Sequence, residues 1–186
     1  MKRAFDVCLV LLILPIVLLP MLVIALLVKL TSKGPALYWS DRVGKGNVLY
    51  RMPKFRSMRI DTPAVATHLL KDPQSHLSPI GSWLRRSSLD ELPQLFSVLI
   101  GDMSFVGPRP ALFNQDDLVA QRTALGIDKL TPGITGWAQV NGRDELSISD
   151  KVALDAEYLQ KQSFVFDLRV FYLTLIKVFK HTGVSH

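Results

Sequence analysis

The chain has 186 residues, a formal net charge of +6 and a hydrophobic fraction of 48%. This length suits one domain with a modest core, and a single cysteine, Cys8, excludes a disulfide framework and a cysteine-based zinc site. The four histidines have no metal-ligand spacing, so no histidine-rich metal site is indicated. The positive charge suits either nucleic acid or an anionic membrane surface, and composition alone does not choose between them.

The first predicted element is an uncharged run from Val7 to Val28. As a straight helix at about 1.5 Å per residue it would reach roughly 33 Å, enough to cross a bilayer core. Pro15 and Pro20 interrupt the run, and each removes a backbone donor and frees the carbonyl four residues earlier. Freed carbonyls are costly in hydrocarbon. Two alternatives therefore remain open, a kinked helix that spans the membrane and a re-entrant helix hairpin that enters and leaves by the same face.

Basic residues flank this run on both sides. Lys2 and Arg3 precede it and Lys29 and Lys33 follow it, with six more shortly beyond: Arg42, Lys45, Arg51, Lys54, Arg56 and Arg59. Positive charge prefers the cytoplasmic side of a membrane, and a re-entrant path puts both flanks there. The run is longer than the apolar part of a secretory signal and no cleavage pattern follows it, so a signal peptide fits poorly.

The middle of the chain predicts a short β-hairpin followed by helices. Residues 36–44 and 48–58 have strand composition and are joined by the glycine turn "GKGN". Residues 61–81 are rich in turn formers and predict a surface loop with a little helix. Apolar spacing then predicts helices over residues 82–87, 92–100 and 112–124.

Two further helices are predicted at the C-terminal side. One begins at the N-cap signal Ser149 and continues to residue 162. The next covers residues 163–180 and is apolar over more than one face, so it is either buried or in contact with a membrane interface, and we favour partial interfacial contact. The whole is predicted to be a mostly helical α+β fold with interfacial amphipathic helices.

The stretch "SLDELPQLFSVLIGDMSFVGPRP", residues 88–110, contains the first candidate for chemistry. Asp90 and Glu91 are adjacent, and adjacent side chains diverge on a helix, so the two carboxylates can take different roles. Taken alone, helix capping is the simplest interpretation. Either Asp90 is an N-cap with Pro93 in the first turn, or Ser88 and Glu91 form a capping box.

Arginines lie close to this acidic pair in sequence. Arg85 and Arg86 precede it, and Pro108 and Pro110 restrict the backbone on either side of Arg109. A held guanidinium is suited to bidentate contact with phosphate. Carboxylates among arginines therefore suggest a phosphorylated substrate with a divalent cation, although each motif taken singly fits a turn or a solvated basic face.

Four motifs together closely resemble the bacterial sugar transferases called monotopic phosphoglycosyl transferases, over nearly the whole chain: "KRAFD", "KFRSM", "RRSSLDELPQLFSVLIGDMSFVGPRP" and "PGITGWAQVNGR". The resemblance implies an enzyme that moves a sugar-1-phosphate from a UDP-sugar to polyprenol (undecaprenyl) phosphate and releases UMP. This reaction is the first membrane step of glycoconjugate synthesis, with Mg²⁺ as cofactor and downstream glycosyltransferases as possible partners. The resemblance also implies a re-entrant membrane helix over residues 1–30 and a catalytic domain over residues 31–186, on the cytoplasmic face of the bacterial inner membrane.

The resemblance assigns roles residue by residue. It makes Asp90 the nucleophile that forms a covalent phospho-sugar intermediate, and it makes Glu91 an assistant that deprotonates the lipid phosphate or helps to hold the metal. Asp90 and Glu91 are thus both expected metal ligands. The expected substrate-binding residues are Arg56, Arg85, Pro108, Arg109, Pro110, Trp137, Asn141 and Arg143. Pro15 and Pro20 are the expected membrane break, and Leu19 stands before Pro20 where small family members often carry a serine.

Two other classes of protein compete with this interpretation. A catalytically silent, membrane-anchored scaffold of a glycan assembly pathway would keep the apolar segment and the basic surface. It would not need Asp90, Glu91 and Arg109 as a set. A nucleic-acid binder would interleave exposed aromatic residues with a basic stripe, whereas the aromatic residues here cluster in apolar runs, so no nucleic acid is expected as a partner.

Overall fold

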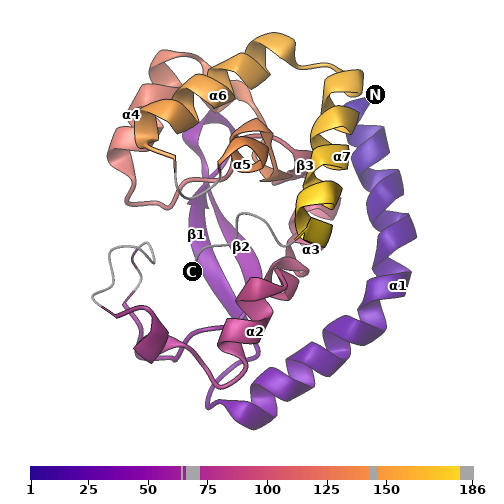
Figure 1. Cartoon of the computed structure of the whole chain (residues 1–186), viewed down its shortest axis with the longest axis vertical. Helices are drawn as coiled ribbons and strands as arrows, with labels where there is room; N and C mark the ends of the chain where they lie inside the picture. The colour runs from indigo at the N-terminus through magenta and orange to yellow at the C-terminus, as the bar shows by residue number, and fades with distance from the viewer. Residues whose placement is uncertain (64, 66–71, 143–145, 181–186) are drawn as a thin grey trace.

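One long helix curves around a β-hairpin and a set of shorter helices in the computed structural model, which describes residues 1–63, 65, 72–142 and 146–180 (Figure 1). The order along the chain is α1 (Lys2–Thr31), β1 (Leu37–Val43), η1 (Lys45–Asn47), β2 (Leu49–Phe55), η3 (Gln74–His76), α2 (Gly81–Arg86), η4 (Leu89–Glu91), α3 (Gln94–Ile100), β3 (Ser104–Val106), α4 (Asp116–Ala124), η5 (Ile127–Lys129), β4 (Gly133–Thr135), α5 (Trp137–Asn141), α6 (Ile148–Lys161) and α7 (Phe164–Lys180), where η marks a 3-10 turn. A mostly helical fold with one short β-hairpin and a long apolar N-terminal helix is thereby confirmed.

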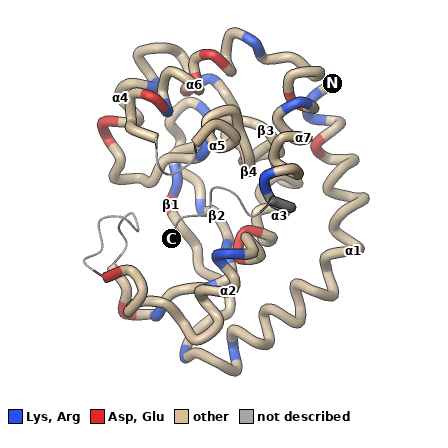
Figure 2. The backbone as a smooth tube through the Cα atoms, in the orientation of Figure 1, with Lys and Arg blue, Asp and Glu red and all other residues tan. Residues whose placement is uncertain are grey.

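Helix α1 is continuous through both prolines. It bends along its length and wraps one side of the molecule, with Pro15 and Pro20 exposed (Figure 1). A bend at proline is expected, because each proline leaves one helical carbonyl without its usual donor. Among the described residues, α1 is the one helix long and apolar enough to cross a membrane. Figure 2 shows its middle turns free of charged residues. The re-entrant path through a bilayer stays a prediction.

The N-terminal end of α1 is fastened to the globular part by charged residues. The ammonium of Lys2 donates to a carboxylate oxygen of Asp167 at 2.5 Å and to the carbonyl of Val106 at 2.8 Å. Asp6 is buried and accepts a hydrogen bond from the hydroxyl of Ser104 at 2.8 Å. The motif "KRAFD" therefore ties the start of α1 to β3 and α7.

The C-terminal end of α1 is fastened to the same body. Arg56, just after β2, donates from Nη2 to the hydroxyl of Ser32 at 2.7 Å and to its carbonyl at 3.1 Å. The buried side chains of Ile24 and Val28 pack in one cluster with Phe55 and Leu84. Both ends of the long helix thus contact one globular domain, while its middle turns expose leucine, isoleucine and valine side chains.

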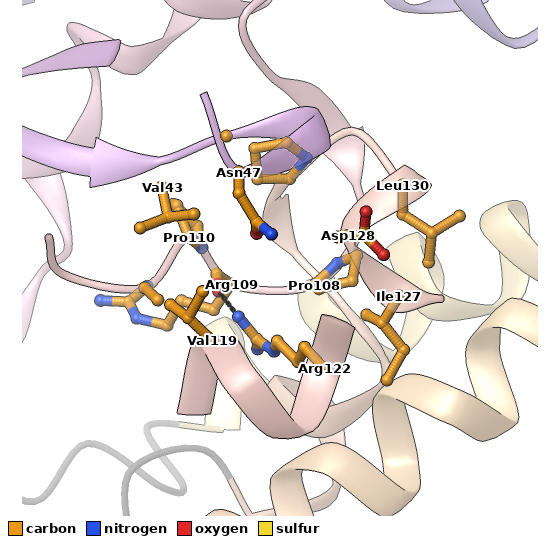
Figure 3. Close-up of a pocket in the computed structure, with 13 residues that line it drawn as sticks. Val43, Asn47, Pro108, Arg109, Pro110, Val119, Arg122, Ile127, Asp128 and Leu130 are labelled. Atoms are coloured by element: carbon orange, nitrogen blue, oxygen red, sulfur yellow. Dashed lines mark hydrogen bonds between the residues drawn. The ribbon is translucent and has the colours of Figure 1, made fainter. Parts of the chain in front are cut away.

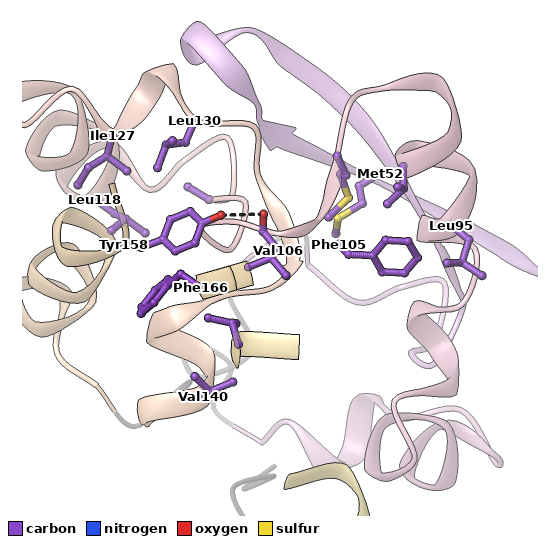
Figure 4. Close-up of a cluster of buried hydrophobic side chains, with 14 of the residues drawn as sticks. Met52, Leu95, Phe105, Val106, Leu118, Ile127, Leu130, Val140, Tyr158 and Phe166 are labelled. Atoms are coloured by element: carbon purple, nitrogen blue, oxygen red, sulfur yellow. Dashed lines mark hydrogen bonds between the residues drawn. The ribbon is translucent and has the colours of Figure 1, made fainter. Parts of the chain in front are cut away.

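The main core lies between the hairpin and the C-terminal helices (Figure 4). Its buried members come from α1, β2, α3, β3, α4, η5, α5, α6 and α7 and from the loops between them, and Tyr158 among them is 1% exposed. The hydroxyl of Tyr158 donates to Asp167 at 2.6 Å, which satisfies a polar group that would be costly to bury alone. Helix α7 packs Phe166 and Val170 into this core and exposes Val165 and Tyr172. Its predicted contact with a membrane interface stays a prediction.

The antiparallel pairing of β1 with β2 confirms the predicted hairpin, and Gly46 and Asn47 take positive φ in its turn. Two details of the helix predictions are wrong. Helix α4 begins at Asp116 instead of Leu112, since residues 112–115 form a turn. Helix α6 is capped by Ser147 instead of Ser149, because the Ser147 hydroxyl accepts from the amide of Asp150 at 3.1 Å.

Sequence reasoning missed a second, two-stranded sheet in which β3 and β4 run parallel. The two strands approach so closely at Gly107 that a Cβ there would lie 2.3 Å from the carbonyl oxygen of Thr131. The amide of Gly107 donates to the carbonyl of Thr135 at 2.9 Å. This close pairing sets the start of the "GPRP" turn against the "PGITG" segment.

Candidate active site

The acidic pair lies in the short turn η4, between α2 and α3. Capping of α3 by either predicted route is wrong, because α3 begins at Gln94 after Pro93 and no side-chain cap bond is made by Ser88 or Pro93. Ser88 instead takes a left-handed conformation, with φ 56°, that is uncommon for a residue with a side chain. Unusual backbone of this kind often marks functional segments, and here it turns the chain immediately before the acidic pair.

Asp90 is buried, with 7% of its surface exposed. Burial raises the pKa of its carboxyl group to about 6, and the neighbouring Glu91 adds to the rise. Lys54, Arg85 and Arg109 act in the opposite direction and favour the carboxylate, but more weakly than burial opposes it. A buried carboxylate that is ionised at neutral pH, among cations, is suited to act as a nucleophile toward an electrophile that those cations also attract.

Glu91 joins two cations that come from distant parts of the chain. Its Oε1 atom accepts a hydrogen bond from the ammonium of Lys54 on β2 at 2.7 Å and from Nη2 of Arg109 at 3.2 Å. Burial lowers the pKa of Lys54, and Glu91 partly offsets that effect. The fold therefore brings β2, η4 and the "GPRP" turn to one site, which the sequence separates by 55 positions between Lys54 and Arg109.

Backbone hydrogen bonds hold the "GPRP" turn near its start and just after its end. The carbonyl of Pro108 accepts from the amide of Gly133 at 2.9 Å, and the carbonyl of Ala111 accepts from the amide of Val43 at 2.9 Å. Pro108 and Pro110 are buried, while Arg109 between them is partly exposed. The turn thus presents one guanidinium from a fixed backbone, and this guanidinium contacts Glu91 of the acidic pair.

Arg42 is a member of this site that sequence reasoning missed. It lies on β1, and its Nη1 donates to the carbonyl of Pro110 at 3.2 Å. Burial lowers the pKa of Arg42 to about 10, and the nearby positive charge of Arg109 lowers it further. In the sequence, Arg42 stands out only as a basic residue after the apolar run, and Lys54 only as such a residue and as the first residue of the motif "KFRSM". The direction in which their side chains point could be known only from the strand register, which pairs Arg42 with Tyr50 and Lys54 with Tyr38.

A small hollow lies behind the "GPRP" turn, on the side of α4 and η5 (Figure 3). Its walls include Pro108, Arg109, Arg122 and Asp128, and its cavity volume is about 30 Å³. This volume has room for about one or two water molecules and is far too small for a nucleotide. We therefore place substrate chemistry at the acidic pair, and we regard the hollow as part of the support of the turn.

Three other predicted site residues, Arg56, Trp137 and Asn141, form hydrogen bonds with groups outside the acidic pair. Arg56 is buried against Ser32, and its Nε and Nη1 atoms have no partner among the described residues. Trp137 donates from its indole to Glu157 at 2.8 Å, and Asn141 donates to the carbonyl of Trp137 at 2.7 Å. The Trp137 bond joins α5 to α6 and the Asn141 bond lies within α5, and the contact of either residue with a substrate stays a prediction. Arg143 lies outside the described residues.

A divalent metal was also expected here. Within the described part of the chain no group of three or more histidine, cysteine or acidic residues could hold a metal ion. The donor set of Asp90 and Glu91 nevertheless fits Mg²⁺, which proteins often bind through one or two carboxylates together with substrate phosphates. The site as built has more positive than negative side chains, so it is prepared for an anionic substrate.

The family described as bacterial sugar transferase matches residues 1–181. The chain therefore belongs to the bacterial sugar transferase family. The match covers both ends of α1, the acidic pair and the "GPRP" turn, so the site described above lies wholly within the part of the chain that the family shares.

Curated relatives share this region at substantial identity. The undecaprenyl-phosphate glucose phosphotransferase of Komagataeibacter xylinus is 40% identical over 94% of this chain, which covers 35% of that relative. The UDP-glucose:undecaprenyl-phosphate glucose-1-phosphate transferase of Escherichia coli (strain K12) is 40% identical over 96% of this chain, which covers 40% of that relative. An uncharacterized sugar transferase of Bacillus subtilis (strain 168), EpsL, is 36% identical over the whole chain, which covers 90% of that relative. The chain thus spans less than half the length of the first two.

Proposed function

We propose that this protein transfers a sugar-1-phosphate from a UDP-sugar to undecaprenyl phosphate, in two steps that both use Asp90. The observation that carries the proposal is the placement of a buried carboxylate among Lys54, Arg85 and Arg109, beside a second carboxylate. The names of the relatives, which describe transfer of this kind, support the substrates. A scaffold without catalysis would gain nothing from burying Asp90 at the cost in free energy that its raised pKa implies.

In the first step a carboxylate oxygen of Asp90 attacks the phosphorus atom that carries the sugar. The bond from this phosphorus to the oxygen bridging the two phosphates breaks, and UMP leaves with that oxygen and its electron pair. The sugar-1-phosphoryl group then remains on Asp90 as an acyl phosphate. Arg109, Arg42 and Lys54 are placed to neutralise the charge that gathers on the phosphate oxygens.

In the second step an oxygen of undecaprenyl phosphate attacks the same phosphorus. The acyl phosphate bond breaks, Asp90 is restored as a carboxylate, and the lipid carries a diphosphate-linked sugar. Glu91 accepts the proton of the lipid phosphate when that phosphate arrives protonated. Its hydrogen bonds to Lys54 and Arg109 hold it beside Asp90 without occupying the nucleophile.

Mg²⁺ would be held by Asp90 and Glu91 together with phosphate oxygens of the UDP-sugar. When bound, it supplies charge neutralisation at the diphosphate, which two carboxylates would otherwise repel.

We further propose that the domain rests on the cytoplasmic face of the membrane, with α1 inserted from that face. Two contacts support this arrangement, the bond from Lys2 to Asp167 at one end of α1 and the bond from Arg56 to Ser32 at the other. A helix whose two ends contact the same domain keeps both ends on the same side of a bilayer. The exposed apolar side chains of its middle turns are then available to lipid.

The deciding experiment uses UDP-sugars that carry ³²P in the phosphate next to the sugar. The purified protein in nanodiscs receives undecaprenyl phosphate and Mg²⁺, and label is measured in the organic phase and in the nucleotide fraction. Relatives act on glucose, galactose and N-acetylgalactosamine derivatives by their names, so these three UDP-sugars form the panel. We expect label in the lipid, unlabelled UMP in water, and loss of both on chelation.

Two alternatives give different distributions of the label. Transfer of the sugar without its phosphate would leave ³²P in UDP. A silent scaffold would leave all label in the UDP-sugar. Either result with every sugar of the panel would contradict the proposed function.

A further inference from the structure

The side chain of Arg122 on α4 is committed to two partners, one of which is the backbone of the "GPRP" turn. Its Nη1 donates to the carbonyl oxygen of Arg109 at 2.8 Å, the contact drawn in Figure 3. Its Nε and Nη2 both donate to Oδ2 of Asp155 on α6, at 3.0 Å and 2.6 Å. Three of its N–H donors are used in this way and only 11% of the side chain is exposed, so little of the guanidinium is open to a substrate.

The partner, Asp155, is 1% exposed, so the two residues form a buried ion pair. Burial raises the pKa of Asp155, and Arg122 opposes that rise. A buried ion pair is often no more stabilising than apolar side chains of the same volume. Stability alone therefore does not account for this pair. Its geometric effect is clearer, because Asp155 fixes the plane of the Arg122 guanidinium and so fixes the donor that meets Arg109.

The next carbonyl of the same turn, that of Pro110, accepts a hydrogen bond from an arginine of another element. Arg42 on β1 donates to the carbonyl of Pro110 at 3.2 Å, and Arg122 on α4 donates to the carbonyl of Arg109. Two successive peptide planes are thus fixed by guanidinium groups from two different elements. The direction in which the Arg109 side chain leaves the backbone is set by the two peptide planes that flank its Cα atom. Arg122 holds the plane after it through the Arg109 carbonyl, and the amide of Gly133 holds the plane before it through the Pro108 carbonyl. The Arg109 side chain reaches Oε1 of Glu91 at 3.2 Å.

We propose that the Arg122–Asp155 pair is a positioning device for Arg109, which aims the Arg109 guanidinium at the phosphates of the nucleotide substrate. The inference rests on the proposed function only in taking those phosphates as the target. Arg42 is unsuited to a test, since it lies close enough to Arg109 and Glu91 to contact an anion itself. Arg122 is the better choice, because three of its five N–H donors are used by Asp155 and the Arg109 carbonyl and only 11% of its side chain is exposed.

The test replaces the pair by apolar residues of similar size, Arg122→Met with Asp155→Leu, so that no buried charge is left unpaired. We expect a protein with a thermal midpoint close to that of the wild type, but with kcat/KM for the UDP-sugar reduced about tenfold and UMP affinity reduced to a similar degree. The exposed ion pair of Arg59 and Asp61 supplies the matched control. Arg59→Met with Asp61→Leu should leave both values unchanged.

A double-mutant cycle separates positioning from a merely structural role. Added to Arg109→Lys, the apolar pair should cost little further activity or UMP affinity, since the group that it positions is already gone. Multiplied losses, or wild-type values for a folded apolar-pair variant, would overturn the inference. If the apolar pair does not fold, Arg122→Lys keeps a cation for Asp155 but lacks the planar fork, and the same cycle applies.

Measuring both transfer activity and UMP affinity keeps this inference distinct from the proposed function. If the wild type binds UMP but transfers nothing, the proposed function fails while coupling in UMP affinity still decides the role of Arg122. If transfer occurs and Arg109→Lys is damaging, but the cycle shows independent effects, the positioning role fails and the proposed function stands.

Discussion

At the level of single residues, burial of the Asp90 carboxylate lowers the stability of the folded state, and under the proposed function it places the nucleophile at the site. Its folded pKa of about 6 lies above its ordinary value of 3.8, and burial is the main cause. Above about pH 6 the carboxyl group is ionised in the folded and the unfolded chain, so the folded state bears the full cost of the buried charge. Below about pH 4 it is protonated in both states and that cost disappears.

Asp90→Asn should therefore stabilise the protein at pH 8 while abolishing transfer. Since one pKa unit corresponds to about 1.4 kcal/mol, the gain should be about 1–3 kcal/mol at pH 8 and should fade as the pH falls from 6 toward 4. Thermal unfolding of the two proteins across this range measures it. The control is Asp41→Asn, the same substitution at an exposed position where no buried charge is removed. A variant less stable than the wild type at pH 8 would contradict our account of Asp90.

Ionisation of Asp90 destabilises the fold, but it should favour catalysis. Only the carboxylate form of Asp90 is a nucleophile, so kcat/KM for the UDP-sugar should rise about tenfold per pH unit below pH 6 and level off above it. Initial rates from pH 5 to 8 at low substrate concentration test this. A profile that is flat between pH 5 and 7 would show that the rate does not depend on this group.

Arg109→Lys should be damaging even though it keeps the charge. The planar guanidinium can meet two phosphate oxygens at once, whereas an ammonium is a point charge. We expect kcat/KM to fall by about 10- to 100-fold. Arg59→Lys, at an exposed surface pair, is the matched control. If the Arg109→Lys enzyme retains wild-type kinetics, Arg109 is not a bidentate phosphate ligand.

At the scale of elements, the sequence predicted those with strong local signals. Apolar spacing placed α3 within two residues of its observed start and at its observed end, where Gly101 takes a left-handed conformation. The parallel pair of β3 and β4 was missed, because strands of three residues have no usable periodicity and their partners lie far apart in sequence. The cap of α6 was displaced because Ser147 and Ser149 are equally good N-cap residues, and only the observed hydrogen bond distinguishes them.

For the site residues, what the sequence could not predict has a related physical cause. Asp90, Glu91 and Arg109 were found because carboxylates and a proline-held arginine carry recognisable chemistry in the sequence. Arg42 and Lys54 lie on strands, and which residues they face depends on pairing and on packing against η4. The hydrogen bond from Arg122 to the Arg109 carbonyl depends on the position of α4, for which the sequence has no local signal.

The bend of α1 is the element-scale feature that membrane topology depends on. Replacing Pro15 and Pro20 by leucine restores two helical hydrogen bonds and should favour a straight helix. A straight helix cannot hold Lys2 at Asp167 and Ser32 at Arg56 together, so the N-terminus should leave the domain and cross the bilayer. The domain should stay inside, because its flank carries more positive charge.

Cysteine accessibility in intact cells measures this topology. Ala4 is exposed near the start of α1, and Ala4→Cys in a Cys8→Ala background places one thiol there. A membrane-impermeant thiol reagent should leave the proline-containing protein unlabelled and should label the variant with both prolines replaced. Labelling of the proline-containing protein would show that α1 spans the membrane.

At the scale of the whole molecule, one arrangement joins the apolar helix to the chemistry. Helix α1 is fastened at both ends to the domain that carries η4, so the depth of α1 in a lipid surface would set the height of Asp90 above that surface. A lipid phosphate is confined to the headgroup layer, and the nucleotide arrives from water. Under the proposed function, this arrangement would place Asp90 where a lipid phosphate and a nucleotide can both reach it in turn.

We propose above that Asp90 carries the sugar-1-phosphate between these two substrates. The most direct measurement incubates the purified protein with a UDP-sugar labelled with ³²P next to the sugar, without lipid acceptor, and determines protein-bound label by mass and by peptide mapping. We predict about one sugar-1-phosphate per active molecule on the peptide that contains Asp90, its retention in Glu91→Gln, and its discharge to lipid when undecaprenyl phosphate is added to the wild type. Transfer to lipid by Asp90→Asn at a rate near that of the wild type would contradict the account.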